Sequence, residues 1–404
     1  MTDRVQVTVA DIERAAETLA GLALRTPMEE SRWLSELTGS PVLLKCENLQ
    51  RTGSFKVRGA YTRMAHLTAD ERARGVVAAS AGNHAQGVAL AAQALGIAAT
   101  VYMPEGAPIP KEKATRAYGA QVVFHGRYLE DSLAEARAFA ERTGAVLIHP
   151  FDNPDVVAGQ GTCGLEILDQ APEMETVVVP CGGGGLLSGI AIAVKSARPD
   201  VRVVGVQAEG AAAFPVSLAA GHPVALDSMS TMADGIAVGL PGEVTFRTVH
   251  DLVDEVVTVS EASLSRAVLA VLERAKLVAE PAGAAAVAAI LDDPDRFGTP
   301  TVAVLSGGNI DPLLLGKVIQ HGMAAAGRYL NLRLRVPDRP GALAELLSDI
   351  GQAGANVIEV SHARIDADLS LDEVEVHLQL ETRGDLHTEA LLTRLRERGY
   401  RVFE

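Results

Sequence analysis

From about residue 40 to residue 325, short apolar segments alternate with alanine-rich segments of helical character. The apolar segments read as strands at 76–79, 99–103, 121–124, 177–180, 202–206 and 301–305. Helices are predicted between them, among others at 85–95, 111–118 and 131–142. Near-continuous apolar strands separated by helices indicate an α/β fold with a mostly parallel sheet covered on both faces. Ligands of such sheets bind at the carboxyl ends of strands, so functional residues are expected in the loops there.

The last part of the chain has a different pattern. Residues 329–404 predict a strand (330–336), a helix (342–353), two strands (357–364 and 374–381), a helix (388–398) and a final strand (401–403). This βαββαβ order is the ferredoxin-like arrangement. We place the boundary near Ala326 and Gly327, which gives domains of 1–325 and 326–404.

Bulk properties exclude several functional classes. The 404 residues suffice for two or three domains. A net charge of −15 argues against a nucleic-acid partner, which needs clustered Lys and Arg. The longest strongly apolar stretch, 282–290, is too short for a membrane span of roughly 20 residues. The N-terminus lacks a secretory pattern, and the widely spaced Cys46, Cys163 and Cys181 show no zinc or redox spacing, so a cytoplasmic setting is expected.

Lys56 lies in the segment Arg51-Thr-Gly-Ser-Phe-Lys-Val-Arg-Gly-Ala60. Gly53 and Gly59 flank it, and no acidic residue follows within a helical turn. An amine held on such a turn is suited to Schiff-base formation. A solvated lysine on a glycine-containing loop is the alternative interpretation.

A run of glycines, Gly182 to Gly185, follows the strand 177–180 and precedes an apolar helix. Successive glycines let several backbone N–H groups approach an anion, and the helix N-terminus favours negative charge. The run therefore predicts a phosphate site. A dinucleotide remains an alternative because Gly183, Gly185 and Ser188 nearly match the G-x-G-x-x-G pattern and Glu209 follows the next strand.

Three further loops carry polar residues. The loop Ser80-Ala-Gly-Asn-His84 precedes a helix and suits a carboxylate, although Ser80 or Asn83 as a helix cap is an equal alternative. Ser306, at the end of the strand 301–305, can reach a ring nitrogen or belong to an ordinary turn. Glu280, in Glu-Pro-Ala-Gly283, is interpreted as a helix cap.

Together these motifs resemble the fold-type II pyridoxal-phosphate enzymes, and in particular the threonine ammonia-lyases (threonine dehydratases). The resemblance implies a two-lobed, tryptophan synthase β-like α/β fold with mostly parallel sheets, the smaller lobe covering roughly 48–150. It further implies that the C-terminal ferredoxin-like domain is an ACT regulatory domain.

The resemblance also implies a role for each site residue. Lys56 would bind pyridoxal 5′-phosphate covalently and act as the base, and Phe55 would pack near the cofactor. Asn83 would bond the 3′ oxygen of the ring, and Ser306 the pyridine nitrogen. The remaining residues would bind the phosphate (Gly182, Gly183, Gly184, Gly185 and Leu186) and the substrate carboxylate (Ser80, Ala81, Gly82 and His84).

Departures from near relatives narrow the expected activity. Serine racemases have a serine where Ala81 stands, so dehydration of threonine without racemisation is favoured. Gln207 and Ala213 occupy positions where related enzymes place carboxylates around a cation, so we predict no metal. The ACT domain implies an isoleucine or valine effector, with loops at 338–343 and 354–356, and a homodimer or homotetramer.

Alternatives remain open at this stage. A serine-preferring dehydratase, or a synthase of the same family, would use the same residues. A dinucleotide-dependent oxidoreductase and a non-catalytic amino-acid sensor are the alternatives from other classes. A purely structural ACT domain would bind no effector.

Overall fold

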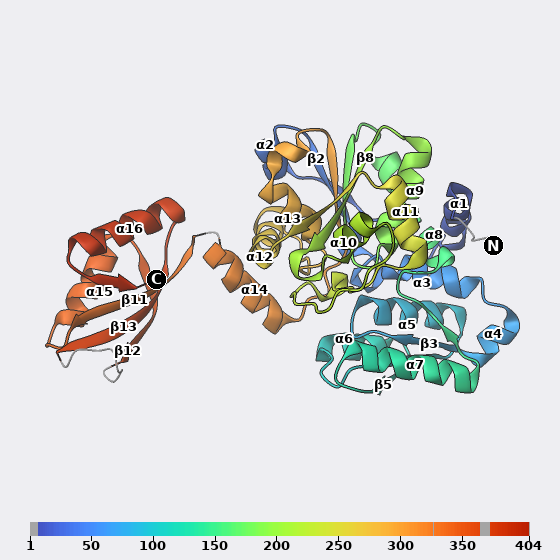
Figure 1. Cartoon of the computed structure of the whole chain (residues 1–404), viewed down its shortest axis with the longest axis horizontal. Coiled ribbons are helices and arrows are strands. Elements are labelled where there is room, and N and C mark those ends of the chain that lie inside the picture. Colours follow the sequence, from blue (N-terminus) through green and yellow to red (C-terminus); the bar gives the residue numbers. More distant parts are fainter. Residues whose placement is uncertain (1–6, 326, 364–371, 404) are drawn as a thin grey trace. The chain divides into compact units, whose positions relative to one another are not determined.

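The chain divides into two compact units, Met1–Leu315 and Gly316–Glu404 (Figure 1). The computed structural model describes residues 7–325, 327–363 and 372–403. The boundary predicted at 325/326 coincides with the end of helix α14 (Pro312–Ala325), whereas the two units separate within that helix. Ala326 itself lies outside the described residues.

The larger sheet of the first unit has six strands in the order β1-β2-β10-β7-β8-β9. All neighbouring pairs are parallel except the edge pair β1–β2, which is antiparallel. The strands are β1 (Met28–Glu30), β2 (Val42–Cys46), β7 (Thr176–Pro180), β8 (Arg202–Ala208), β9 (Glu255–Val259) and β10 (Thr301–Leu305).

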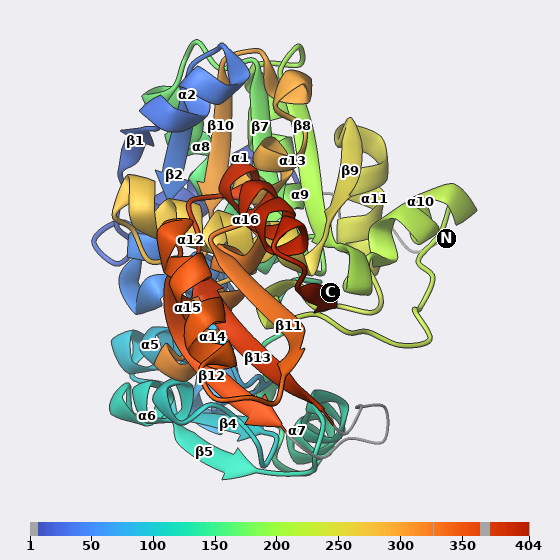
Figure 2. The ribbon, with the colours of Figure 1, turned by 90° about the vertical axis from the view of Figure 1, so that its left-hand side faces the viewer.

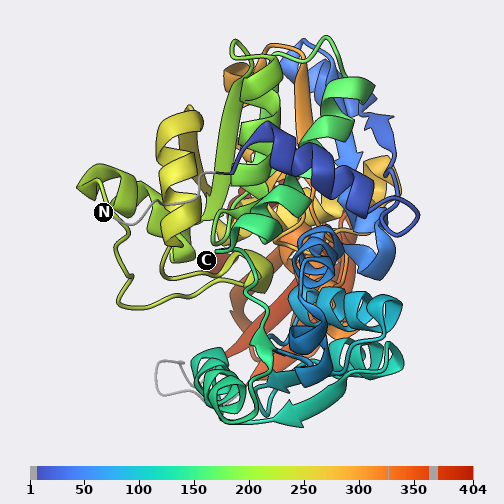
Figure 3. The same ribbon diagram turned by 90° about the vertical axis from the view of Figure 1, so that its right-hand side faces the viewer.

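The strands between β2 and β7 in sequence form a second, fully parallel sheet in the order β5-β4-β3-β6. They are β3 (Val76–Ala79), β4 (Ala99–Met103), β5 (Gln121–Phe124) and β6 (Val146–Leu147). The periodicity of the sequence indicated one sheet, and this is wrong, because periodicity does not record which strands pair. The two-lobed architecture with mostly parallel sheets is confirmed (Figure 3).

Helices cover both faces of each sheet. In the small lobe, α5 packs with Val76 and Ala78 on one face, while Val77 and Ala79 face α7 on the other. In the large lobe, α8, α9 and α11 lie on the face that carries Val177 and Val179. The first-unit helices are α1 (Val9–Thr18), α2 (Arg32–Thr38), α3 (Lys56–Ala65), α4 (Ala69–Arg74), α5 (Asn83–Leu95), α6 (Ile109–Ala117), α7 (Leu129–Thr143), α8 (Pro154–Gln170), α9 (Gly185–Ala197), α10 (Ala213–Ala220), α11 (Glu243–Leu252), α12 (Glu261–Ala270) and α13 (Ala285–Asp292).

The second unit is a four-stranded antiparallel sheet in the order β12-β13-β11-β14 (Figure 2). Alternate residues of β11 and β13 pack against α15 and α16 and form one apolar core. The elements are β11 (Tyr329–Pro337), α15 (Ala342–Gln352), β12 (Asn356–Ala363), β13 (Glu373–Glu381), α16 (Asp385–Glu397) and β14 (Arg401–Phe403). The predicted ferredoxin-like order is confirmed, and Arg364, the predicted end of the second strand, lies outside the described residues.

Among the described residues, no helix is both long enough and apolar enough to cross a lipid bilayer.

Candidate active site

Lys56 is the first residue of helix α3. It is therefore held by a helix rather than by the loop that its glycine neighbours suggested. The strained turn precedes it, since Thr52 has a φ of 66° and is buried. The Lys56 Nζ donates a hydrogen bond of 3.1 Å to the carbonyl oxygen of Pro150. Burial lowers the pKa of Lys56 from 10.5 to about 8, against the attraction of the Glu280 carboxylate.

The segment before Lys56 is fastened to the loop that follows β10. The Phe55 amide donates to the Ser306 carbonyl oxygen at 3.2 Å, and Ser54 forms an isolated antiparallel bridge with Gly307. The Phe55 ring centroid lies 5.1 Å from the Lys56 Nζ. Ser306 is buried, and its hydroxyl has no protein partner among the described residues. The structure therefore brings two of the predicted motifs into direct contact.

The four glycines connect β7 to α9 and pack closely against other parts of the lobe. A Cβ on Gly183 would lie 2.4 Å from the Phe151 ring, and one on Gly184, whose φ is 90°, 2.7 Å from Phe214. The carbonyl oxygens turn toward the protein, where Gly183 accepts a 2.6 Å bond from the Thr245 hydroxyl. The four glycine N–H groups have no protein partner in the part of the chain that the structure describes. Unpaired donors at the start of a helix form a cradle for a phosphate.

The loop 149–153 connects Lys56 with the glycine run, and sequence reasoning missed it. Pro150 accepts the bond from Lys56, and Phe151 covers Gly183. The His149 Nδ1 accepts bonds from the amides of Phe151 and Asp152, so its ring is neutral, and burial lowers the pKa of His149. The Asp152 carboxylate accepts amide bonds at the first turn of α11. No local pattern marks this loop, because its role depends on contacts with residues about 30 and 90 positions away.

The loop Ser80 to His84 lies between β3 and α5, and α5 packs directly on the backbone of Lys56. The Ser80 hydroxyl accepts a 3.1 Å bond from the Gly82 amide, and Ala81 lies between these two residues. The His84 ring bonds the Ile148 carbonyl oxygen at 2.8 Å through Nε2, and burial lowers its pKa to about 3. A neutral ring whose one N–H is occupied offers a carboxylate no donor, so a role for the His84 side chain in carboxylate binding has no support here.

Asn83 begins α5, and its side chain is already bonded at both ends. Its Nδ2 donates to Glu280, and its Oδ1 accepts a 2.9 Å bond from Asn309. The expected cap role of Glu280 is wrong, because helix α13 has Ala284 as its N-cap without a side-chain bond. Glu280 is instead a buried carboxyl beside the predicted cofactor-binding residues.

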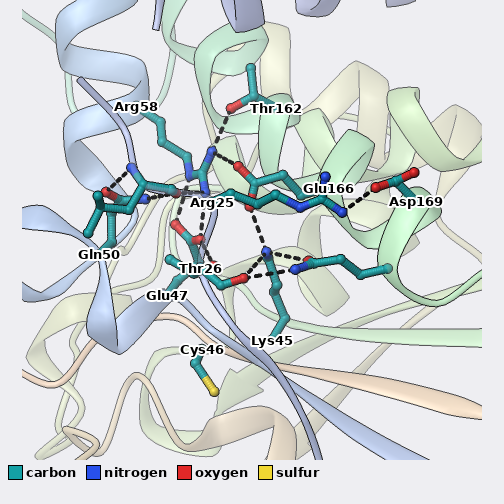
Figure 4. A network of polar contacts seen from close by, with 12 residues as sticks. Arg25, Thr26, Lys45, Cys46, Glu47, Gln50, Arg58, Thr162, Glu166 and Asp169 are labelled. Carbon is teal, nitrogen blue, oxygen red and sulfur yellow. Dashed lines mark hydrogen bonds and ion pairs between the residues drawn. The ribbon is translucent and has the colours of Figure 1, made fainter. Parts of the chain in front are cut away.

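A network of buried charges lies behind the first turn of α3 (Figure 4). Arg58 makes two bonds to Glu47, of 2.7 and 2.8 Å, and a third of 2.7 Å to Glu166. Lys45 reaches the other oxygen of Glu166 at 2.6 Å. Arg58 and Glu47 are buried at about 1% exposure or less, so each charge depends on its partners. The network fixes the helix that carries Lys56.

Gln207 occupies the place where a carboxylate was considered a cation ligand. Its Nε2 donates to the Gly182 carbonyl oxygen at 3.3 Å, and its Oε1 accepts from the Phe214 amide at 2.9 Å. The side chain thus supports the glycine run directly. Among the described residues, no group of three or more His, Cys, Asp or Glu side chains could hold a metal ion.

Residues 19–307 match the family model described as "Pyridoxal-phosphate dependent enzyme", and residues 331–399 match the ACT domain. An L-threonine ammonia-lyase of Thermotoga maritima is 48% identical over 396 residues, which cover 98% of this chain and 99% of the relative. The chain belongs to the pyridoxal-phosphate-dependent threonine ammonia-lyases. These enzymes are carbon–nitrogen lyases, and the family assignment removes the dinucleotide alternative for the glycine run.

Solved structures agree with this assignment. A threonine deaminase from the organism abbreviated T.th. superposes with a TM-score of 0.72 at 45% identity, over 75% of this chain and 99% of that chain. A maize serine racemase has a TM-score of 0.74 at 35% identity, over 78% and 97%. The shared fold does not separate lyase from racemase, so the substrate must be argued from the site.

The residues of this chain fit the cofactor. The unpaired N–H groups from Gly182 to Gly185 match a phosphate, with Leu186 in the first turn of α9. The Lys56 amine would bind the aldehyde carbon, and the unpartnered hydroxyl of Ser306 is available to the ring nitrogen. These assignments remain predictions about the individual residues.

Proposed function

We propose that this chain converts L-threonine to 2-oxobutanoate and ammonia, with Lys56 as both the cofactor anchor and the base. The observation that carries the proposal is the convergence of the Lys56 amine, the unpaired glycine N–H groups and the Ser306 hydroxyl. Relatives named L-threonine ammonia-lyase, 46% and 48% identical over nearly the whole chain, support the choice of substrate.

When bound, the cofactor withdraws electrons from the substrate's Cα, which acidifies the Cα–H and allows the β-hydroxyl to leave. Lys56 removes the Cα proton and needs a neutral amine to do so. At pH 8 a pKa of 10.5 leaves ~0.3% of an amine neutral, whereas a pKa of about 8 leaves about half of it neutral. Burial of Lys56 therefore supplies a base near physiological pH.

Other residues restrict the outcome. The amides of Ser80 to Asn83, at the start of α5, are placed to bind the substrate carboxylate. Ala81 has no proton to exchange on the face opposite Lys56, which disfavours racemisation. The neutral Ser306 hydroxyl keeps the ring a weaker electron sink than a carboxylate would, which favours elimination. Elimination releases water, and hydrolysis of the tautomerised product yields 2-oxobutanoate and ammonia.

The ACT domain supports regulation by an amino acid. We propose isoleucine or valine as the effector, at the loops that precede α15 and β12. Gly341, with a φ of 93°, opens α15, and Gly354, with a φ of 81°, precedes β12, so both loops present backbone groups at a glycine turn. Binding between two copies in a homodimer or homotetramer, and a cytoplasmic location with a role in isoleucine biosynthesis, belong to the same proposal.

The test compares the wild type with Lys56→Ala and with Lys113→Ala, a control on the exposed side of α6. We expect threonine-dependent release of 2-oxobutanoate to disappear in Lys56→Ala and to persist in Lys113→Ala. Turnover by Lys56→Ala at the wild-type rate would refute the role of Lys56. The same assay with isoleucine or valine tests the effector.

A serine-preferring dehydratase of the same family is the second candidate. It is favoured only by the resemblance of the fold to a serine racemase. We expect kcat/KM for threonine to exceed that for serine, and the opposite order would reverse the substrate assignment.

A further inference from the structure

Glu280 is a buried carboxyl to which the proposed mechanism gives no role. It lies in the loop before α13, and its side chain is about 3% exposed. Its Oε1 accepts a hydrogen bond from the Asn83 amide. Its Oε2 is buried and has no hydrogen-bond partner in the part of the chain that the structure describes. A buried carboxylate with a free oxygen is costly unless it serves a nearby group.

The surrounding glycines leave the space that this carboxyl needs. A Cβ on Gly307 would lie 2.4 Å from Oε1, and one on Gly235 would lie 3.7 Å from the same atom. Gly307 belongs to the loop that holds Phe55 and Ser306, next to Lys56 in sequence and in space. Glu280 therefore reaches the centre of the site rather than its rim.

Charged groups from three other elements face Glu280. Lys111, on α6, approaches Oε2 at 4.0 Å and also bonds Asp234 at 2.9 Å. Lys56, on α3, interacts with Glu280 electrostatically. Burial raises the pKa of Glu280 to about 7, against the attraction of Lys111 and with the repulsion of Asp234. His84 and His149, the other titratable groups that Lys56 senses, are held neutral by burial.

Asn309 determines which end of the Asn83 amide meets Glu280. The Asn309 Nδ2 donates to the Thr52 carbonyl oxygen and, at 2.9 Å, to the Asn83 Oδ1. Because Asn83 must present its oxygen to Asn309, its Nδ2 points to Glu280. One N–H of that Nδ2 then remains free for another acceptor.

We propose that Glu280 is a positioning residue of the active site, which orients the Asn83 amide toward the cofactor and places a negative charge opposite the Lys56 amine. Two separable effects follow from this geometry. The hydrogen bond to Asn83 affects cofactor affinity, and the charge affects the titration of Lys56. The proposal rests on the assignment of Lys56 as the cofactor anchor.

Three variants separate the two effects. Glu280→Gln keeps an acceptor for Asn83 and removes the charge. Glu280→Ala removes both, and Asn309→Ala releases the Asn83 amide without changing any charge. Glu209→Gln, an exposed acid after β8, is the matched control. Thermal melting of each apo-protein establishes that it is folded.

The first measurement is the pH dependence of acetylation of Lys56 in the apo-protein, read by mass spectrometry. We expect a midpoint near pH 8 for the wild type, Asn309→Ala and Glu209→Gln. Loss of an attractive negative charge lowers the pKa of an amine, so we expect Glu280→Gln to shift the midpoint down by about one pH unit. An unchanged or raised midpoint in Glu280→Gln overturns the electrostatic role.

The second measurement is the dissociation constant of pyridoxal phosphate, titrated into the apo-protein by absorbance. We expect affinity to fall about tenfold or more in Glu280→Ala and Asn309→Ala, and by less than threefold in Glu280→Gln. Equal losses in Glu280→Gln and Glu280→Ala overturn the positioning role. Neither readout requires threonine, so both remain informative if the substrate assignment fails.

Discussion

Replacement of Arg58 by Met tests whether the buried charge network holds α3, the helix that begins at Lys56. Arg58 balances Glu47 through two bonds and shares Glu166 with Lys45. In Arg58→Met one buried cation faces two carboxylates, and Glu47 keeps only the Thr26 hydroxyl and the distant charge of Lys45. Breaking a buried pair from one side costs about 3–5 kcal/mol.

A loss of this size lowers the melting temperature by roughly 6–10 °C, at about 2 °C per kcal/mol for a unit of this size. Scans of the apo-protein at one fixed rate measure it, because irreversible unfolding makes the midpoint depend on the rate. The double variant Glu47→Gln/Arg58→Met removes the stranded charge, and we expect it to recover several degrees. A single variant within 2 °C of the wild type, or a double variant with no recovery, would refute the reasoning.

The network also makes a statement about pH. Burial acts to raise the pKa of Glu47, but the Arg58 charge and hydrogen bonds outweigh it and hold that pKa below 4.5. Glu47 thus contributes stability that is present above the unfolded pKa and is lost as the pH falls through the folded one. Without Arg58, burial would raise the folded pKa instead, so the stabilising form would be the protonated one. We expect the stability deficit of Arg58→Met to shrink as the solution is acidified.

Three further predictions concern the site and the core. Gly184→Ala places a Cβ 2.7 Å from Phe214 at a φ of 90°, so we expect at least tenfold weaker cofactor binding, measured by absorbance titration; Gly221→Ala, also at positive φ but facing open space, should leave binding unchanged. Because the base must be neutral, kcat for threonine should rise with pH through about 8 and then level off, and a rate that falls over this range would exclude Lys56 as the base. Burial raises the pKa of Cys46 to about 12, and all three cysteines are buried, so alkylation of the folded protein by iodoacetamide should proceed far more slowly than in urea.

The sequence predicted the local elements well, because each depends on neighbouring residues. The strand 301–305 and the helix that ends at Leu95 have the predicted limits there, since Thr301–Leu305 is fully apolar apart from Thr301 and Gly96 ends the helix in the left-handed conformation. The division into two sheets was missed, because apolar strands such as β3 and β7 carry the same composition whichever sheet they join.

The same limit applies to the site. The glycine run and Lys56 were visible because their residue types are unusual in their local context. The loop at Phe151 and the acid Glu280 were missed or misinterpreted, since their roles come from contacts far along the chain. Arg58 stands two positions from Lys56, yet its partner Glu166 is more than a hundred residues away, and no spacing rule connects them.

The pairing of β2 with β10 has a consequence for the order in which the molecule can form. All four strands of the small sheet lie between Val76 and Leu147, so that sheet can close soon after its residues have left the ribosome. The large sheet cannot, because β2 at residues 42–46 waits for β10 at residues 301–305. At 5–20 residues per second, this delay of roughly 250 residues lasts about 12–50 s. During that interval β2 presents an unpaired apolar edge, which makes the nascent chain a natural client for a chaperone.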